Sequence, residues 1–331
     1  MNILLTGGTG YIGSHAAVVL VEAGHNVILF DNLSNSHSNV VDRLSMITNQ
    51  SIPFIEGDVR DTFMLSKILK DYGIEAVMHF AGLKAVGESV EKPIEYFNNN
   101  VGGTISLLEA MHENRVKRLV FSSSATVYGE PQYLPIDENH PTSAINPYGR
   151  TKLHIEGILE DLVYSDTDWK IACLRYFNPV GAHESGLIGE DPAGIPNNLM
   201  PIIAMVAAGK LKYLNIFGND YATTDGTGVR DYIHVIDLVL GHLSALNFLN
   251  HNNGCHFFNL GTGKGFTVFE MVKAFERVSN RKINYKISPR RGGDVASYCA
   301  DVSKAKHELL WEARFDLNKM CESGWLWQSK S

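Results

Sequence analysis

The chain has 331 residues, of which 44% are hydrophobic and 20% are charged, as is ordinary for a globular protein. The formal net charge of -7, without any run of Lys or Arg, argues against a nucleic-acid-binding surface. Four scattered cysteines without Cys-x-x-Cys spacing, and histidines without metal-ligand spacing, imply neither a metal site nor a disulfide framework. No apolar run reaches membrane-spanning length, and the chain begins directly with a strand-like segment. We therefore expect a cytoplasmic protein without membrane or nucleic-acid partners.

A glycine-rich turn follows the first predicted strand. Residues 3–6 are apolar or β-prone and lead into Gly7, Gly10 and Gly13, after which apolar residues recur on one face of a helix. A strand that enters a helix through glycines leaves the first helical N–H groups unpaired, which suits the pyrophosphate of a dinucleotide. The spacing G-x-x-G-x-x-G differs from the common G-x-G-x-x-G fingerprint, and a glycine turn without a ligand is the alternative.

The second predicted strand, residues 26–30, ends at Asp31. A carboxylate at this place can accept hydrogen bonds from the adenosine ribose and would repel a 2′-phosphate, so NAD is favoured over NADP. Alternatively, Asp31 only caps the loop that follows it.

Further strands alternate with helices. Strands are predicted at 52–57, 76–82 and 117–124, and the helices between them include a long one that begins at Pro93. His79 lies inside a strand, where a buried, hydrogen-bonded histidine is the simplest interpretation. Asn98, Asn99 and Asn100 are poor helix formers, so at least one of them is expected to serve a polar partner.

This alternation predicts an α/β fold with a doubly wound parallel (Rossmann) sheet. Ligands bind beyond the carboxyl ends of such strands, where we expect Gly10, Asp31, Asp58, Gly82 and Ser124. The rest of the chain is less regular, with loops at 181–198 and 220–231, helices at 200–209, 235–249 and 267–278, and strands at 213–217, 256–260 and 283–287. We expect an NAD-binding domain of residues 1–177, to which the chain returns around 232–262, and a smaller α/β substrate-binding domain of residues 178–331.

Tyr148 and Lys152 are one helical turn apart and lie on one face of a helix that begins at Pro147. A tyrosine has an ordinary pKa of about 10, so its use as a base near neutral pH requires a fall of ~3 units. A close ammonium group and a positively charged nicotinamide ring are neighbours that could lower the pKa in this way. Ser124, at the end of the preceding strand, would bind the same substrate oxygen. Taken alone, Tyr-x-x-x-Lys also fits an ordinary helix face with a lysine that reaches solvent.

Gly7, Gly10, Gly13, Ser124, Tyr148 and Lys152 together resemble the extended short-chain dehydrogenase/reductase superfamily. Within it, five longer stretches resemble the UDP-glucose 4-epimerase family, namely 79–89, 122–129, 175–182, 196–201 and 225–235. The resemblance extends from Met1 to about Gln328. It implies that Tyr148, as phenolate, takes the proton of the sugar 4-hydroxyl while C4 gives a hydride to tightly bound NAD. The resulting UDP-4-keto-hexose would turn and receive the hydride on its other face, so that UDP-glucose and UDP-galactose interconvert.

The resemblance also implies contact residues. Those for NAD are Gly7, Gly10, Tyr11, Ile12, Gly13, Asp31, Asn32, Leu33, Ser34, Asn35, Ser36, Asp58, Val59, Phe80, Ala81, Gly82, Leu83, Lys84, Asn99, Tyr148, Lys152 and Phe177. Those for the UDP-sugar are Lys84, Ala85, Val86, Ser124, Asn178, Asn198, Leu199, Met200, Asn215, Phe217, Arg230, Arg291, Asp294 and Tyr298. Arginine suits phosphate oxygens, although a solvated surface charge is the alternative for both arginines.

In this family, the position of Tyr298 is bulky in enzymes confined to UDP-glucose and UDP-galactose and small in those that also accept N-acetylated sugars. Tyr298 therefore implies poor use of UDP-N-acetylglucosamine, whereas an alignment shifted by one residue, to Cys299, would reverse this expectation. The helices after Pro93 and Pro147 resemble those that pair in a family homodimer.

Two other functions are weighed against the epimerase. A nucleotide-sugar 4,6-dehydratase shares the first hydride step but needs adjacent carboxylates where this chain has Ala125 and Thr126. A non-catalytic NAD-sensing protein on the same fold would have little reason to keep Ser124, Tyr148 and Lys152 together.

Overall fold

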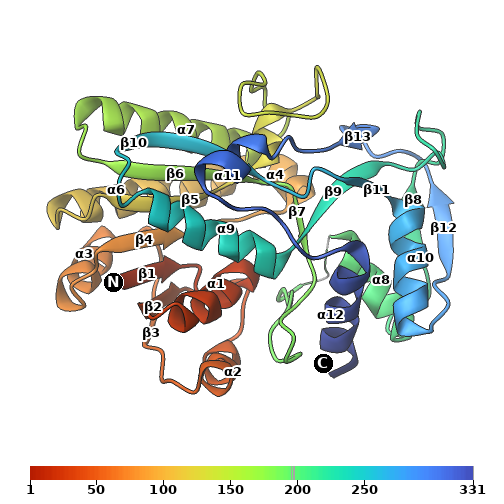
Figure 1. Cartoon of the computed structure of the whole chain (residues 1–331), viewed down its shortest axis with the longest axis horizontal. Helices are drawn as coiled ribbons and strands as arrows, with labels where there is room; N and C mark the ends of the chain where they lie inside the picture. Colours follow the sequence, from red (N-terminus) through yellow and green to blue (C-terminus); the bar gives the residue numbers. More distant parts are fainter. Residues whose placement is uncertain (195, 197, 331) are drawn as a thin grey trace.

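The computed structural model describes residues 1–194, 196 and 198–330. Within these residues, seven parallel strands form one sheet in the order β10-β6-β5-β4-β1-β2-β3 (Figure 1). Its strands are β1 (Asn2–Thr6), β2 (Asn26–Asp31), β3 (Phe54–Glu56), β4 (Ala76–His79), β5 (Arg118–Ser124), β6 (Lys170–Tyr176) and β10 (Gly254–Leu260). The predicted doubly wound α/β fold is confirmed.

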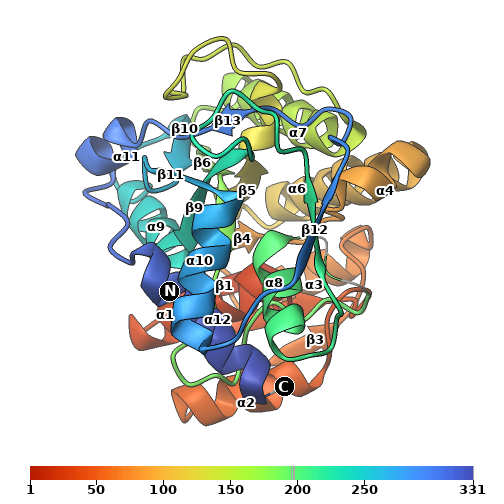
Figure 2. The same ribbon diagram turned by 90° about the vertical axis from the view of Figure 1, so that its right-hand side faces the viewer.

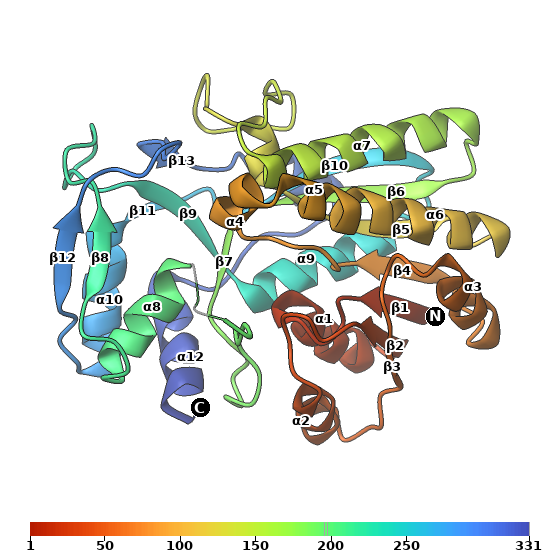
Figure 3. The same ribbon diagram turned by 180° about the vertical axis from the view of Figure 1, so that it is seen from behind.

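Helices cover both faces of this sheet, as Figures 1 and 3 show from opposite sides. One face carries α1 (Tyr11–Glu22), α2 (Asn39–Thr48) and α9 (Val235–Phe248). The other carries α3 (Thr62–Asp71), α6 (Gly103–Glu113) and α7 (Pro147–Ser165). Successive strand residues alternate between two hydrophobic cores, because Ile3 and Leu5 face the first set of helices and Leu4 faces the second.

Some predicted elements differ from those observed. The sequence analysis did not predict β6 or α2, and β3 and β4 are shorter than expected. α1 is buried from Gly13 to Val21 rather than on one face, because it packs between the sheet, α2 and α9. The long helix after Pro93 is interrupted: α4 (Val86–Glu91) and α5 (Pro93–Tyr96) lead into a π-helical turn (Phe97–Gly102), which α6 follows.

A smaller α/β unit lies beyond the carboxyl ends of these strands, and Figure 2 views the molecule from its side. In it β9 (Val229–His234) pairs with β7 (Asn178–Val180), β11 (Gly265–Thr267) and β13 (Ser297–Tyr298), while β8 (Leu214–Phe217) pairs with β12 (Tyr285–Ser288). The predicted loop at 220–231 was therefore too long, since β9 begins inside it. α8 (Leu199–Ala207), α10 (Val268–Ser279) and α12 (Leu317–Lys330) share a third core, and α11 (Ser303–Glu308) packs near β10. Residues 195 and 197 of the predicted loop 181–198 lie outside the described residues.

Buried histidines make the fold sensitive to acid. Burial lowers the pKa of His15 and His79 to about 3 and the pKa of His234 and His242 to about 4. His79 is hydrogen-bonded to the hydroxyls of Thr6 (2.6 Å) and Thr104 (2.9 Å), which confirms that it is a buried structural residue. The unfolded chain takes up protons at these rings below pH 6.5, whereas the folded chain does not, so stability is fully present above pH 6.5 and falls below it.

We therefore expect the free energy of unfolding to decrease by up to ~1.4 kcal/mol per pH unit for each of these histidines below pH 6.5. Urea unfolding at pH 7.5, 6.5 and 5.5 measures this dependence. A midpoint that stays constant or rises toward pH 5.5 would contradict it.

Among the described residues, no helix combines the length and the apolar character that a bilayer span requires.

Candidate active site

The glycine turn between β1 and α1 is closely packed against the backbone. Gly7 has φ +69°, and a Cβ atom there would lie 2.7 Å from the Ala81 nitrogen. A Cβ atom at Gly13 would lie 2.2 Å from the Gly7 carbonyl oxygen. Gly10 precedes the first turn of α1, which no side chain of the described residues caps. This glycine turn, which we call the glycine cradle, therefore leaves helical N–H groups of α1 available to an anion. It fits a dinucleotide pyrophosphate.

Asp31 lies beside this turn at the end of β2. Its carboxylate accepts hydrogen bonds from the Thr9 nitrogen (3.2 Å), the Leu33 nitrogen (2.9 Å) and the Ser36 hydroxyl (3.3 Å). Asp31 thus does cap its loop, as the alternative interpretation proposed, and it also joins that loop to the glycine turn. Asp58 lies nearby and accepts a hydrogen bond from Asn32 (3.4 Å), and its bonds to Arg60 lower the pKa of its carboxyl to about 2.

Asn100 holds the segment that follows β4. Its side chain accepts a hydrogen bond from the Leu83 nitrogen (2.8 Å) and donates to the Leu83 oxygen (3.0 Å) and to the Thr151 hydroxyl (3.1 Å). The predicted contact residue Asn99 donates to Asn100 (3.0 Å). One of the three adjacent asparagines was expected to serve a polar partner, and the structure identifies Asn100, which joins the backbone after Gly82 to the helix of Lys152.

Ser124, Tyr148 and Lys152 meet at the end of β5. The Ser124 hydroxyl lies close enough to the Tyr148 phenol to lower its pKa, and it accepts a hydrogen bond from the Thr126 hydroxyl (2.9 Å). The Lys152 ammonium group donates to the Ser122 carbonyl (2.6 Å) and lies over the Phe121 ring (4.8 Å). These three residues lie close together because Ser124 ends β5, and β5 ends beside the first turns of α7, which carry Tyr148 and Lys152.

The electrostatics of this group differ from the expectation. Burial raises the pKa of Tyr148 more than its bond to Ser124 lowers it, and burial also lowers the pKa of Lys152 to about 8. The protein groups alone therefore shift the pKa of Tyr148 away from the value a base needs. Use of Tyr148 as a base would require a further positive charge beside the phenol to lower its pKa.

Several predicted UDP-sugar contacts converge on β9 and β13. Arg230 donates to the carbonyls of Val229 and Val295 (both 2.9 Å) and pairs with Asp294 (3.3 Å). Arg291 lies 3.8 Å from the centre of the Phe217 ring. Arg230 is thus half-buried among its partners, whereas Arg291 is exposed and, among the described residues, contacts only a ring, so a surface charge stays open for it.

Tyr298 on β13 faces the predicted catalytic group, which consists of Ser124, Tyr148 and Lys152. Its hydroxyl donates to the Ala125 carbonyl (2.7 Å), next to Ser124, and its ring packs against Phe177. Cys299 points elsewhere, with its sulfur 3.8 Å from the Asp231 carboxylate.

Lys84 and Asn198 share one partner that the sequence analysis missed. A single carboxylate oxygen of Glu190 accepts hydrogen bonds from the Lys84 ammonium (2.8 Å) and from the Asn198 amide (2.7 Å). Lys84 follows β4, and Asn198 directly precedes α8, whose first residues are the predicted contacts Leu199 and Met200. The predicted contacts Ala85 and Val86 begin α4.

A buried ion pair beneath the catalytic group was also missed. Arg175 on β6 binds the carboxylate of Glu156 on α7 through two nitrogens (3.0 and 2.8 Å), and Ser123 donates to the same carboxylate (2.6 Å). The sequence analysis gave no sign of this pair, because it did not predict β6, which carries Arg175.

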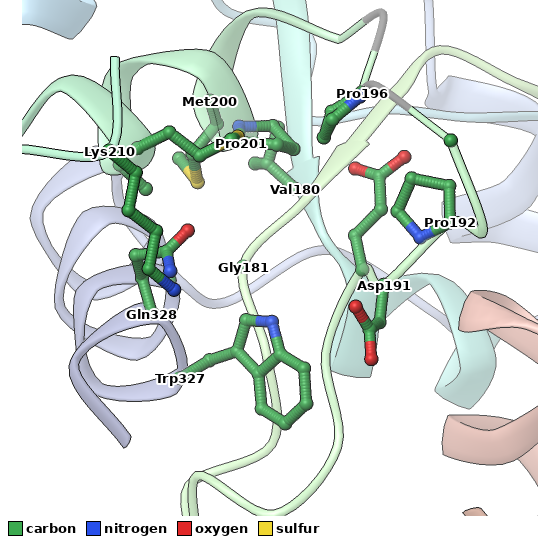
Figure 4. Close-up of a pocket in the computed structure, with 15 residues that line it drawn as sticks. Val180, Gly181, Asp191, Pro192, Pro196, Met200, Pro201, Lys210, Trp327 and Gln328 are labelled. Atoms are coloured by element: carbon green, nitrogen blue, oxygen red, sulfur yellow. The ribbon is translucent and has the colours of Figure 1, made fainter. Parts of the chain in front are cut away.

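A cavity of about 200 Å³ lies between α8, α12 and the segment after β7. Figure 4 shows Trp327, Gln328 and Lys210 on one side of it and Asp191 and Pro192 on the other. It contains Met200 but not Ser124, Tyr148 or Lys152, so it is separate from the catalytic group.

Comparison with known proteins places the chain in a family. Residues 4–323 match the family model described as GDP-mannose 4,6 dehydratase. The UDP-glucose 4-epimerase of Bacillus subtilis is 55% identical over 331 residues, covering 100% of this chain and 98% of that protein. The crystal structure of the enzyme from Stenotrophomonas maltophila, with bound NAD and formylated UDP-arabinopyranose, matches with a TM-score of 0.98 at 51% identity, covering 100% of this chain and 98% of that one.

The enzyme from Bifidobacterium longum, in complex with NAD+ and UDP, matches with a TM-score of 0.97 at 49% identity, again over 100% of this chain and 98% of that one. Although the family model carries a dehydratase description, Ala125 and Thr126 stand after Ser124, and neither side chain can act as the acid or base that dehydration needs. With relatives above half identity over its full length, the chain belongs to the UDP-glucose 4-epimerase family.

Proposed function

We propose that this chain is an NAD-dependent isomerase, a UDP-glucose 4-epimerase that interconverts UDP-glucose and UDP-galactose. The observation that carries the proposal is that Ser124, Tyr148 and Lys152 meet at the end of β5, at the same edge of the sheet as the uncapped N-terminus of α1 in the glycine cradle. NAD bound there would supply a hydride acceptor and then a hydride donor, and the charge of its nicotinamide ring is the positive charge that Tyr148 lacks in the protein alone.

In this proposal each catalytic side chain has a distinct task. Tyr148 accepts the proton of the sugar 4-hydroxyl. It returns a proton to the same oxygen after the UDP-4-keto-hexose has rotated to present its other face. Ser124 binds this oxygen by a hydrogen bond and keeps it within reach of Tyr148. Lys152 is fixed by Ser122 and holds its ammonium group beneath the cofactor site.

We also propose that one part of the chain binds NAD and the other binds the UDP-sugar. Residues 1–177, with the return around 232–262, would hold NAD through the contacts that the family resemblance assigns. Residues 178–331 would hold the UDP-sugar. This is supported by β10 and α9, which lie in and against the large sheet, and by Arg230, Arg291 and Asp294, which gather in the smaller unit.

Purified protein given UDP-galactose alone should form UDP-glucose without added NAD. The reason is that the cofactor ends each turnover unchanged and stays bound. Release of free NADH, or formation of a 4-keto-6-deoxy sugar, would contradict the epimerase and favour the dehydratase instead.

Tyr298 should exclude N-acetylated sugars, since its ring occupies space beside Ser124. The hydrogen bond to Ala125 and the packing against Phe177 hold the ring there. We expect Tyr298→Gly to raise the kcat/KM ratio for UDP-N-acetylgalactosamine over UDP-galactose by roughly 10–200-fold, the range for a change in pocket shape. Cys299→Gly is the matched control and should leave the ratio unchanged. Comparable use of both sugars by the unaltered protein would contradict this role.

We propose in addition a cytoplasmic homodimer that acts in galactose metabolism. The dimer is supported by exposed apolar side chains on the helices after Pro93 and Pro147: Ile94 is 84% exposed, Ile105 42% and Tyr164 91%. Light scattering on the purified protein measures the mass, and a monomer at micromolar concentration would contradict this assembly.

A further inference from the structure

The segment from Gly181 to Ala193 connects the two parts of the site. At its start the Tyr11 hydroxyl donates to the Gly181 carbonyl (2.7 Å), and at its end the Ala193 nitrogen donates to Asn35 (3.3 Å). Tyr11 and Asn35 are both assigned to NAD by the family resemblance. The segment is therefore anchored at both ends to the cofactor side.

The opposite side of this segment packs on α12. A Cβ atom at Gly189 would lie 2.5 Å from the Trp327 ring, so the backbone lies flat on the indole, and Arg43 stacks on that ring at 5.3 Å. Figure 4 shows Trp327 among the residues that line the cavity. The Trp327 ring thus supports the backbone next to Glu190 and limits the positions that the Glu190 side chain can take.

Glu190 reaches from this support to two predicted substrate contacts. Its side chain is only 9% exposed, and one oxygen accepts from both Lys84 (2.8 Å) and Asn198 (2.7 Å). The Lys84 side chain is 48% exposed and would otherwise sample many rotamers. Glu190 restricts Lys84 before substrate arrives, which removes part of the entropic cost of ordering this lysine side chain on binding.

The same bond fixes the orientation of the Asn198 amide. Because its nitrogen donates to Glu190, its carbonyl oxygen points the other way and remains an acceptor for a substrate N–H or hydroxyl. Without Glu190 the amide can turn over and present either end.

We propose that Glu190 is a positioning residue for the UDP-sugar: it holds the Lys84 ammonium and the Asn198 amide in the orientation in which they bind substrate. This rests on the proposed epimerase function. The competing interpretation is that Glu190 occupies the place of the substrate and has to be displaced, in which case its removal would tighten binding.

Glu190→Ala and Glu190→Gln separate these possibilities in steady-state assays with UDP-galactose. We expect Glu190→Ala to raise KM about tenfold with kcat within about twofold, because uniform binding is lost. Glu190→Gln keeps an acceptor for Asn198 but loses the charge opposite Lys84, so its KM should be intermediate. Asp191→Ala removes the neighbouring exposed carboxylate and should match the unaltered protein. A KM that falls in Glu190→Ala would overturn the proposal.

A double-mutant cycle tests whether Glu190 acts through its two partners. In a Lys84→Met/Asn198→Ala background, adding Glu190→Ala should change KM by less than twofold, whereas a general effect on the fold would add its full tenfold. Calorimetric titration of UDP-galactose into Tyr148→Phe, with and without Glu190→Ala, should show the same tenfold loss without turnover. Absence of epimerisation by the unaltered protein would refute the function separately, since the calorimetry reads Glu190 independently.

Discussion

Tyr148→Phe is expected to lower kcat for UDP-galactose by 10²–10⁴-fold, the usual contribution of a positioned general acid or base. The change removes the hydroxyl and keeps the ring, so the packing of the ring is preserved and only the contact between the hydroxyl and Ser124 is lost. Ser124 and the predicted UDP-sugar contacts of the smaller unit, such as Arg230, stay in place and should still bind the UDP-sugar. KM should therefore change much less than kcat in a coupled assay for UDP-glucose.

Tyr72→Phe is the matched control because Tyr72 follows the last turn of α3, outside this site and the proposed dimer surface, and is 39% exposed. It should keep full activity. Calorimetry should show that Tyr148→Phe binds UDP-galactose nearly as the unaltered protein does. If Tyr148→Phe kept more than a tenth of the activity, another group would have to be the base.

The parts of the site that follow from local spacing could be predicted from the sequence. Gly7, Gly10 and Gly13 have defined roles within one turn, and Tyr148 and Lys152 must share a helix face once the helix is recognised. Ser124 joins them because parallel strands end at one edge of the sheet.

The missed parts depend on contacts between distant segments. Glu190 meets Lys84 across 106 positions of sequence, and nothing in the composition of either segment indicates this pairing. Asn100 lies in the π-helical turn and is hydrogen-bonded to the backbone of Leu83. The sequence of the helix does not reveal this contact with a distant segment. β6 was missed because its short apolar run is compatible with a strand or a buried helix.

The pKa of Tyr148 shows a limit of a different kind. Spacing places Lys152 one turn from Tyr148, but the ammonium group donates to the Ser122 carbonyl, and burial of the phenol outweighs the other protein contributions. The charge balance of a base depends on desolvation, which a sequence pattern does not encode. In the proposed mechanism, Tyr148 therefore acts as a base only when the positive charge of NAD is in place beside it.

Arg175→Met should destabilise the fold by about 3–5 kcal/mol, the usual cost of leaving one member of a buried ion pair alone. The Arg175 and Glu156 side chains are 6% and 3% exposed, and two nitrogens of the guanidinium bind the two carboxylate oxygens. Methionine would fill much of the space between Tyr128 and Phe257, over which the guanidinium stacks, but would leave the Glu156 carboxylate with Ser123 alone. Urea unfolding at pH 7.5 measures the loss.

Two further variants separate charge from packing. Arg175→Met/Glu156→Met removes both charges and should recover most of the lost stability, because an apolar pair needs no compensation for desolvation. Lys306→Met breaks an ion pair with Glu312 whose side chains are 60% and 57% exposed, and it should leave the urea midpoint unchanged because solvent screens that pair. Equal midpoints for Arg175→Met and the unaltered protein would contradict a structural role for the buried pair.

Glu156 lies one turn after Lys152 on α7, and Ser123 directly precedes Ser124 on β5. A loss of this pair should therefore also loosen α7 against β5. The activity of Arg175→Met is therefore expected to fall at temperatures below its unfolding midpoint, whereas that of the double variant should follow its recovered stability.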